Sequence, residues 1–237
     1  MRKNSRKIIV YPAIIGISLG VYSCSYNSER YISTSTETST ETRTQATTDT
    51  VTKTVTSTNT KTSTETRPVI SSDFPKKDWV SFTEKAIEEV GQNLLNTTVE
   101  EEKELCLTKE NRKAAYVMLF SALAKFESAY KPETFYKENF KDAKGNFVIS
   151  RGLLQISQES ANSYGCNITD AKQLHDPETN LRCGVRILNK WVGMDKKIEG
   201  GTTGKWFGAS RYWSVFRKSD RIKYIFDRVK TVTCKGK

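Results

Sequence analysis

A run of Ser and Thr separates the part of this chain that can fold from a part that cannot. Residues 33–66 contain 22 Ser or Thr among 34 positions, and the residues between them are mostly polar or charged. The segment has no apolar face to bury, so nothing offsets the conformational entropy that ordering would cost. We therefore predict a disordered tether over residues 24–70 and a folded domain over residues 73–237.

The first 23 residues are typical of an export signal. Four basic residues and no acidic residue precede an apolar stretch over residues 8–21, which is shorter than the ~18–20 residues of a membrane-spanning helix. The following letters, "VYSC", resemble a bacterial lipobox, which predicts cleavage after Ser23 and lipidation of Cys24. A plain cleaved signal and an uncleaved N-terminal anchor are the alternatives. We expect an exported protein, periplasmic or at the cell surface, held to a membrane by its lipid.

The net charge narrows the range of partners. The chain carries 38 Lys and Arg against 27 Asp and Glu, and loss of the four basic signal residues would lower its net charge from +11 to +7. An exported basic protein suits an anionic partner such as a cell-wall polymer or a membrane surface. No nucleic-acid recognition motif accompanies the charge, so we expect no nucleic-acid partner.

The cysteines predict two disulfides and no metal site. If Cys24 is lipidated, four cysteines remain in an exported chain, an even number. Three pairings exist. We favour Cys166–Cys183, which are close in sequence, together with Cys106–Cys234, which would join the two ends of the domain. The chain has one His and no C-x-x-C spacing, which argues against a zinc site.

Helical patterns dominate the sequence after the tether. Apolar residues recur at helical spacing in most of these stretches, and Asp176 followed by Pro177 is a strong start signal for one helix. The predicted helices cover residues 72–96, 108–128, 157–165, 176–192 and 218–232. Residues 142–150, with a turn at 144–146, predict a small hairpin or loop between two helices. The expected fold class is therefore mainly α.

Three short motifs follow one another in this domain. Glu127-Ser128 closes an apolar helix, "RGLLQIS" occupies residues 151–157, and "HDPETNLRCGVRIL" occupies residues 175–188. In this order they resemble the soluble lytic transglycosylase family, which shows an ES pair, a G-L-x-Q-I stretch and a D-P-x-x-N-x-x-x-G helix. The resemblance implies a lysozyme-like helical domain, here with a small hairpin or loop insertion, that acts on peptidoglycan glycan strands without a cofactor.

Glu127 is the candidate catalytic residue. Cleavage of a glycosidic bond needs an acid that is still protonated near neutral pH, and a glutamate beside Phe126 on an apolar helix is desolvated, which raises its pKa. The resemblance implies that Glu127 protonates the leaving oxygen of the MurNAc-GlcNAc β-1,4 bond. Glu127 would then act as base on the sugar's own 6-hydroxyl and produce a 1,6-anhydro end. Considered alone, such a glutamate is more often solvent-facing.

The same resemblance implies residues that contact the substrate. Ser128 would bond the Glu127 carboxylate or the sugar, and Gln155 would line the sugar cleft. The family usually carries an A-Y-N-A-G-type stretch whose Tyr reaches the catalytic glutamate. Its nearest counterpart here lies at residues 208–217, where Tyr212 takes the position of the Tyr and Trp213 departs from the pattern.

The stretch between the first two motifs leaves the reaction type open. It contains three acids, Glu133, Glu138 and Asp142, and an acid that faces Glu127 across the cleft could activate water. The enzyme would then be a hydrolytic muramidase on the same fold, and Asp142 is the first candidate for this second acid. A non-catalytic peptidoglycan-binding module is the remaining alternative, and the presence of Glu127 argues against it.

Overall fold

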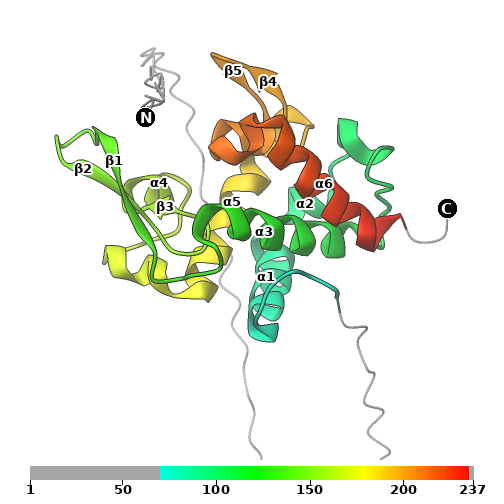
Figure 1. Ribbon diagram of the computed structural model, residues 1–237, viewed down its shortest axis with the longest axis horizontal. Helices are drawn as coiled ribbons and strands as arrows, with labels where there is room; N and C mark the ends of the chain where they lie inside the picture. Colours follow the sequence, from blue (N-terminus) through cyan, green and yellow to red (C-terminus); the bar gives the residue numbers. More distant parts are fainter. Residues whose placement is uncertain (1–69, 235–237) are drawn as a thin grey trace, which may run out of the picture. The chain divides into compact units, whose positions relative to one another are not determined.

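The computed structural model describes residues 70–234, which are the coloured part of Figure 1. The predicted signal peptide, Cys24 and the predicted tether up to residue 69 lie outside the described residues. The described part is mainly α, as expected, and contains six α-helices with four short 3-10 helices and five short strands. Between residues 70 and 234, none of the helices combines the length and the apolarity needed to cross a membrane.

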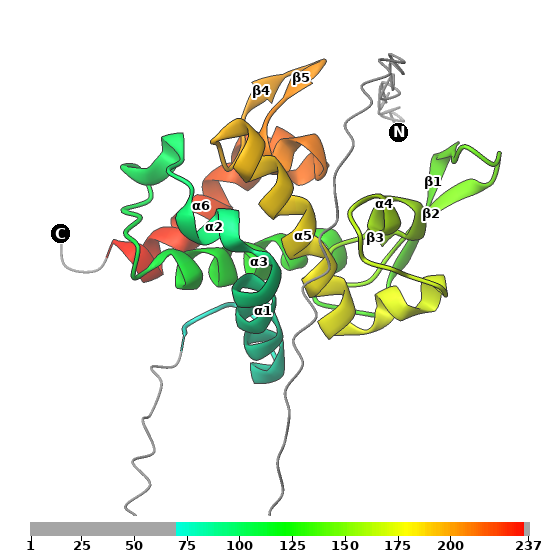
Figure 2. The same cartoon turned by 180° about the vertical axis from the view of Figure 1, so that it is seen from behind.

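Four longer helices form the body of the domain. They are α1 (Lys77–Val90), α3 (Arg112–Ser128), α5 (Pro177–Asp195) and α6 (Ser219–Thr233). α5 packs against α1, and α6 packs along α3, as Figures 1 and 2 show from opposite sides. The shorter helices are α2 (Gln92–Asn96), α4 (Gln158–Ser163), η1 (Glu100–Glu102), η2 (Ala171–His175), η3 (Gly208–Arg211) and η4 (Ser214–Arg217).

α3 runs through the middle of the core. Its sequence is almost continuously apolar, and every residue from 115 to 124 is buried. A helix that is apolar on all sides must be surrounded by other elements. Ala129 follows in the left-handed conformation (φ 51°) and ends the helix. Glu127 therefore lies in the last turn, where the core meets solvent.

α5 begins where the sequence predicts. The Asp176 carboxylate accepts a hydrogen bond from the Thr179 backbone N–H at 2.8 Å, and Pro177 occupies the first helical position. Both features favour a helix start, because the cap satisfies a free N–H group and proline lacks one there. This fixed start places the N-terminal turns of α5 against the loop that follows the β-hairpin.

A three-stranded antiparallel sheet in the order β1-β2-β3 lies beside the helices. β1 (Phe135–Lys141) pairs with β2 (Phe147–Arg151), which pairs with β3 (Ile156–Ser157). The hairpin is longer than the sequence predicts, because its first strand begins at Phe135 rather than after residue 141. It projects from the helical body in Figures 1 and 2. A second, minimal hairpin consists of β4 (Gly201–Thr202) and β5 (Lys205–Trp206).

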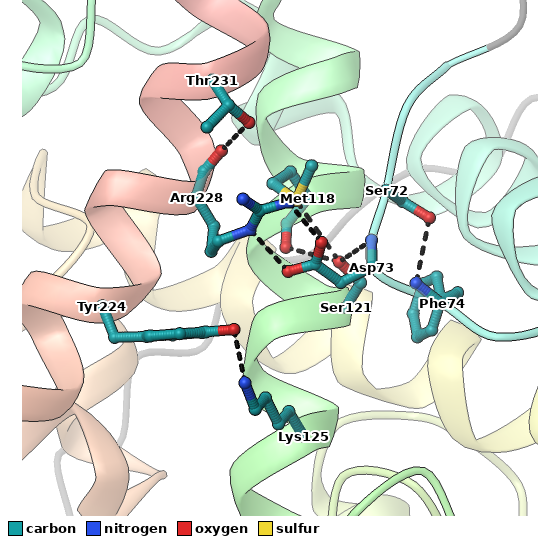
Figure 3. Close-up of polar contacts among 9 residues, drawn as sticks. All are labelled: Ser72, Asp73, Phe74, Met118, Ser121, Lys125, Tyr224, Arg228 and Thr231. Carbon is teal, nitrogen blue, oxygen red and sulfur yellow. Dashed lines mark hydrogen bonds and ion pairs between the residues drawn. The ribbon is translucent and has the colours of Figure 1, made fainter.

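Two disulfides and an ion pair join distant parts of the chain. The disulfides are Cys106–Cys234 and Cys166–Cys183, which is the pairing that the sequence favours. Figure 3 shows the carboxylate of Asp73 accepting hydrogen bonds from the guanidinium of Arg228 at 2.8 and 2.5 Å. The Asp73 backbone N–H also donates to Ser121 Oγ at 3.1 Å, so the start of the described chain is attached to both α3 and α6.

Candidate active site

Glu127 stands half-buried in the last turn of α3. Burial raises the pKa of Glu127 to about 7, the negative charge of Glu138 adds to this rise, and the positive charge of Lys218 opposes it. Among residues 70–234, no hydrogen bond or ion pair occupies its carboxyl group. The group is thus a carboxylic acid that holds its proton near neutral pH and is free to give it to a ligand.

The second carboxylate of the site belongs to Glu138 on β1. Ser150 on β2, itself buried, donates a hydrogen bond from Oγ to Glu138 Oε1 at 2.8 Å. Tyr136 pairs directly with Ser150 in the hairpin register, so Tyr136, Glu138 and Ser150 share one face of the hairpin. The negative charge of Glu138 contributes to the raised pKa of Glu127, and β1, which carries Glu138, begins shortly after α3 ends.

Asp142, the expected second acid, has a different role. Its Oδ1 accepts hydrogen bonds from the backbone N–H groups of Lys144 at 2.9 Å and Asn146 at 2.8 Å, which makes it the turn residue of the β1–β2 hairpin. Asp142 also does not contribute to the pKa of Glu127, whereas Glu138 does. The structure therefore moves the candidate second acid from Asp142 to Glu138.

Ser128 forms its hydrogen bond within its own helix. It is buried, and its hydroxyl donates to the carbonyl of Ala124 in its own helix at 3.2 Å. A serine that bonds to the preceding helical turn satisfies itself locally. This placement does not support the substrate contact expected from the sequence, and it makes Ser128 part of the helix end that positions Glu127.

Gln155 braces two loops near the site. Its side-chain amide donates to the carbonyl oxygens of Gly152 at 2.9 Å and Thr134 at 3.2 Å, and its backbone is left-handed (φ 49°). The bond to Thr134 ties the residue just before β1 to the turn after β2. Gln155 therefore holds the base of the hairpin that carries Glu138.

Tyr212 and Lys218 close the site from the C-terminal part of the chain. Burial raises the pKa of Tyr212 above its usual value, hydrogen bonds to Ser160 and to the Ser157 backbone lower it, and the charge of Glu127 raises it slightly further. The charge of Glu127 is the smallest of these influences, and the contact with Glu127 that the resemblance implies stays a prediction. Lys218, the exposed residue before α6, is a cation whose charge lowers the pKa of Glu127.

The glycine and asparagine of the motifs build the scaffold behind Glu127. Asn180 is fully buried, and its amide donates to the carbonyls of Arg151 at 3.0 Å and Leu174 at 2.9 Å while its oxygen accepts from the Leu154 N–H at 2.9 Å. Gly152 has φ +76°, and a Cβ there would lie 2.0 Å from the Leu174 carbonyl oxygen. Both positions are explained by packing and hydrogen bonding rather than by chemistry.

The tryptophans near Tyr212 differ in environment. Trp213 is a core residue with 2% exposure, and its indole N–H donates to the carbonyl of Leu154 at 2.9 Å. Trp206 is half-buried on β5, with the Arg217 guanidinium 5.3 Å from its ring centroid. Trp213 therefore cannot stack on a sugar. No cluster of metal-ligating side chains occurs in the part of the chain that the structure describes.

Sequence reasoning considered Glu138 without selecting it and did not identify Lys218. The segment over residues 135–141, "FYKENFK", mixes aromatic and charged residues on both faces, so its sequence does not predict a strand. Without the strand, the sequence cannot show which of the three acids faces Glu127. The signal that could have found Glu138 is its position two residues after Tyr136, the residue opposite Ser150 in a hairpin that begins at Phe135.

Comparisons with known proteins identify the family of the chain. A family model described as the transglycosylase SLT domain matches residues 104–209, a range that includes Glu127 and Glu138 and ends before Tyr212. Among curated proteins none matches. Solved structures of a protein called DslA are similar: a wild-type form and one Glu→Gln variant each show 41% identity and a TM-score of 0.63, covering 67% of this chain and 92% of theirs. A second Glu→Gln variant shows 39% identity and a TM-score of 0.61, covering 66% and 90%.

Proposed function

Because the chain belongs to the transglycosylase SLT domain family, which acts on peptidoglycan, we propose that it cuts the MurNAc-GlcNAc β-1,4 bond with Glu127 as the proton donor. The pKa of Glu127, raised to about 7, is the observation that supports this role most directly. A glutamate with an ordinary pKa would already have lost its proton at neutral pH. The raised pKa keeps a large fraction of Glu127 protonated there, as a general acid requires.

The leading reaction is that of a lytic transglycosylase. Glu127 gives its proton to the glycosidic oxygen as the bond from that oxygen to C1 of MurNAc breaks. The resulting Glu127 carboxylate then takes the proton of the MurNAc 6-hydroxyl while the 6-oxygen bonds to C1. The product is a 1,6-anhydro end, water is not consumed, and no cofactor is needed. Lys218 supports the step in which Glu127 is ionised, because its positive charge favours the carboxylate.

Hydrolysis is a second candidate, and Glu138 is the observation that favours it. A carboxylate across the cleft from the acid can take a proton from water while that water attacks C1. Ser150 holds Glu138 in place for such a role. The DslA variants also replace two glutamates that are eleven positions apart, and Glu127 and Glu138 have the same separation.

Export and membrane anchoring complete the proposal. We propose that cleavage before Cys24 and its lipidation attach the chain to a membrane, with the Ser/Thr-rich segment as a spacer. A flexible chain of ~45 residues would spread over roughly 35–40 Å, which is enough reach for a wall polymer near the membrane. A Cys24→Ser variant that still carries the lipid mass, or that still partitions with membranes, would contradict this part.

Product analysis tests the reaction. The mature chain is incubated with purified peptidoglycan, and the fragments are identified by mass spectrometry. We expect 1,6-anhydro ends from the transglycosylase reaction, whereas reducing ends would establish the hydrolase. A Glu127→Gln variant should yield neither product, and full activity of that variant would remove Glu127 from the role of proton donor. No cleavage by the wild type, with retained sedimentation on peptidoglycan, would indicate a binding module.

A further inference from the structure

The β1–β2 hairpin exposes an unusual number of aromatic rings. Among the described residues, five large hydrophobic side chains are exposed, and four of them lie on this hairpin. They are Phe135 at 65%, Tyr136 at 60%, Phe140 at 42% and Phe147 at 46% exposure. The hairpin also projects from the body of the domain, as both views show. An apolar cluster that no part of its own domain covers indicates a surface that contacts a partner.

Half of this cluster lies on the face opposite Glu138. Lys137 pairs with Ile149 and Lys141 pairs with Phe147, with an irregularity in β1 between the two pairs. The register therefore places both lysines on the same side as Phe147, and their ammonium groups lie 4.0 and 5.3 Å from the centroid of its ring. Strand alternation puts Phe135 on this side as well. We call Phe135, Lys137, Lys141 and Phe147 the outer face of the hairpin.

Protection of an edge strand against aggregation does not explain the composition of the outer face. β1 is an edge of its sheet, and lysines on an edge strand do discourage aggregation. Exposed phenylalanines have the opposite effect, so protection alone would not select them. The turn of the hairpin is also ordered by the Asp142 side chain, which keeps the outer face presented rather than collapsed onto the domain.

The charge of the outer face indicates what it contacts. Within residues 70–234, neither Lys137 nor Lys141 forms an ion pair with a carboxylate, so both positive charges are available to a partner. Aromatic rings pack on the apolar C–H faces of sugars, and lysines attract carboxylates. A polymer with both features is a glycan whose sugars carry lactyl and peptide carboxylates.

We propose that the outer face of the hairpin docks on the peptidoglycan network at a second place, separate from the strand that is being cut. The opposite face of the hairpin, with Tyr136, Glu138 and Ser150, carries the acid that acts on Glu127. A glycan strand in the active site would therefore pass along that face. The outer face then meets an adjacent strand or its peptides. This inference rests on the proposed function for the identity of the polymer, but it concerns binding rather than cleavage.

Sedimentation with insoluble peptidoglycan tests the docking. All proteins are mature full-length chains with Glu127→Gln, so that cleavage does not remove the ligand. The variant Lys137→Gln/Lys141→Gln should bind about fivefold more weakly, because two exposed charge contacts are each worth about 0.5 kcal/mol. Its remaining binding should also depend less on salt. Phe147→Ser should weaken binding by a similar factor through loss of the stacked ring.

The matched control removes two lysines elsewhere. Lys103 and Lys109 are exposed and lie near the Cys106–Cys234 disulfide, and Lys103→Gln/Lys109→Gln makes the same change in net charge. If the control loses as much peptidoglycan binding as the hairpin variant, net charge alone explains the loss and the proposal is overturned. Unchanged binding of the hairpin variant would also overturn it. A second arm uses the same chains with Cys24→Ser, which carry no lipid, and vesicles of phosphatidylglycerol and phosphatidylethanolamine. Loss of vesicle binding with intact peptidoglycan binding would assign the outer face to a membrane and overturn the proposal.

A cleavage assay with chains that retain Glu127 distinguishes failure of the docking proposal from failure of the proposed function. Two rates are measured for each chain, the cleavage of intact peptidoglycan and the cleavage of short soluble fragments. If the outer face docks on the network, the first rate divided by the second should be about fivefold lower in the Lys137→Gln/Lys141→Gln variant than in the wild type. Absence of cleavage by the wild type would defeat the proposed function but would leave the sedimentation result valid. Cleavage with an unchanged ratio would defeat only the docking.

Discussion

At the scale of single residues, Glu127 is defined by what surrounds it. A glutamate in the last turn of an apolar helix is desolvated on the core side and open on the other. Burial is the largest cause of its raised pKa, and the charges of Glu138 and Lys218 act on it in opposite directions. The two neighbours come from different elements, so the proton affinity of Glu127 depends on the hairpin and on the start of α6 together.

Replacing Glu138 should move the pH dependence of catalysis. A general acid works in its protonated form, so activity falls as pH rises through its pKa. Glu138→Gln removes a negative charge that raises the pKa of Glu127, and the alkaline limb of the pH–rate profile should therefore shift to lower pH. The measurement is the rate of peptidoglycan cleavage between pH 5 and 9.

Asp142→Asn provides the matched control, because it removes an acid from the same hairpin that does not act on Glu127. Its alkaline limb should stay where the wild type has it. A Glu138→Gln profile with an unmoved limb would show that Glu138 lies too far away to influence Glu127. A large fall in rate at every pH would instead favour the hydrolytic route, in which Glu138 activates water.

At the scale of elements, the site depends on a short turn clamped between the hairpin and α5. Asn180 on α5 makes hydrogen bonds to backbone groups on the two sides of this turn, at Arg151 and Leu154, and a third to the Leu174 carbonyl in η2. Gly152 lies where a side chain would strike the Leu174 carbonyl. The base of the hairpin, and with it Glu138, is therefore positioned from behind by residues that never meet the substrate.

Asn180→Ala should destabilise the domain strongly. The change leaves two backbone carbonyls and one backbone N–H without their partner in the protein interior, and each such loss costs about 1–3 kcal/mol. We expect the free energy of unfolding to fall by about 3 kcal/mol or more, measured by urea denaturation. Asn162→Ala is a suitable comparison, because Asn162 also bonds backbone groups but is exposed. An equal loss in both variants would contradict the role of Asn180 as a buried clamp.

At the scale of the whole molecule, the two disulfides differ in how much chain they constrain. Cys106–Cys234 closes a loop with a sequence separation of 128 residues, and Cys166–Cys183 closes one of 17. A cross-link stabilises chiefly by restricting the unfolded chain, so the longer loop gains more. The first disulfide joins the segment before α3 to the end of α6. These two helices pack along each other.

Replacing each pair by serine should show this difference. Cys106→Ser/Cys234→Ser should lower the free energy of unfolding by about 5 kcal/mol, and Cys166→Ser/Cys183→Ser by about 3 kcal/mol. Denaturant titration of both double variants beside the wild type measures the two losses. The larger loss in the short-loop variant would show that native packing around Cys166 and Cys183, rather than chain entropy, sets their contribution.

The sequence by itself determined the fold class and the family, and it supplied Glu127 as the candidate proton donor. Each of these depends on patterns along the chain: the spacing of apolar residues, the helix start signals at Asp176 and Pro177, and the order of the three motifs. The roles expected for Ser128 and Asp142 could not be decided in this way. Which groups a side chain meets depends on how its helix or strand is rotated against its neighbours, which a sequence pattern does not record.

Only the tertiary structure made Glu138 the candidate second acid and showed which residues form the outer face of the hairpin. Glu138 was one of three acids in an insertion, and strand pairing selected it by setting Ser150 beside it. The same pairing placed two lysines over Phe147 on the opposite side. The physical reason is the two-residue period of a strand, which assigns neighbours to opposite faces once the register is set by its partner.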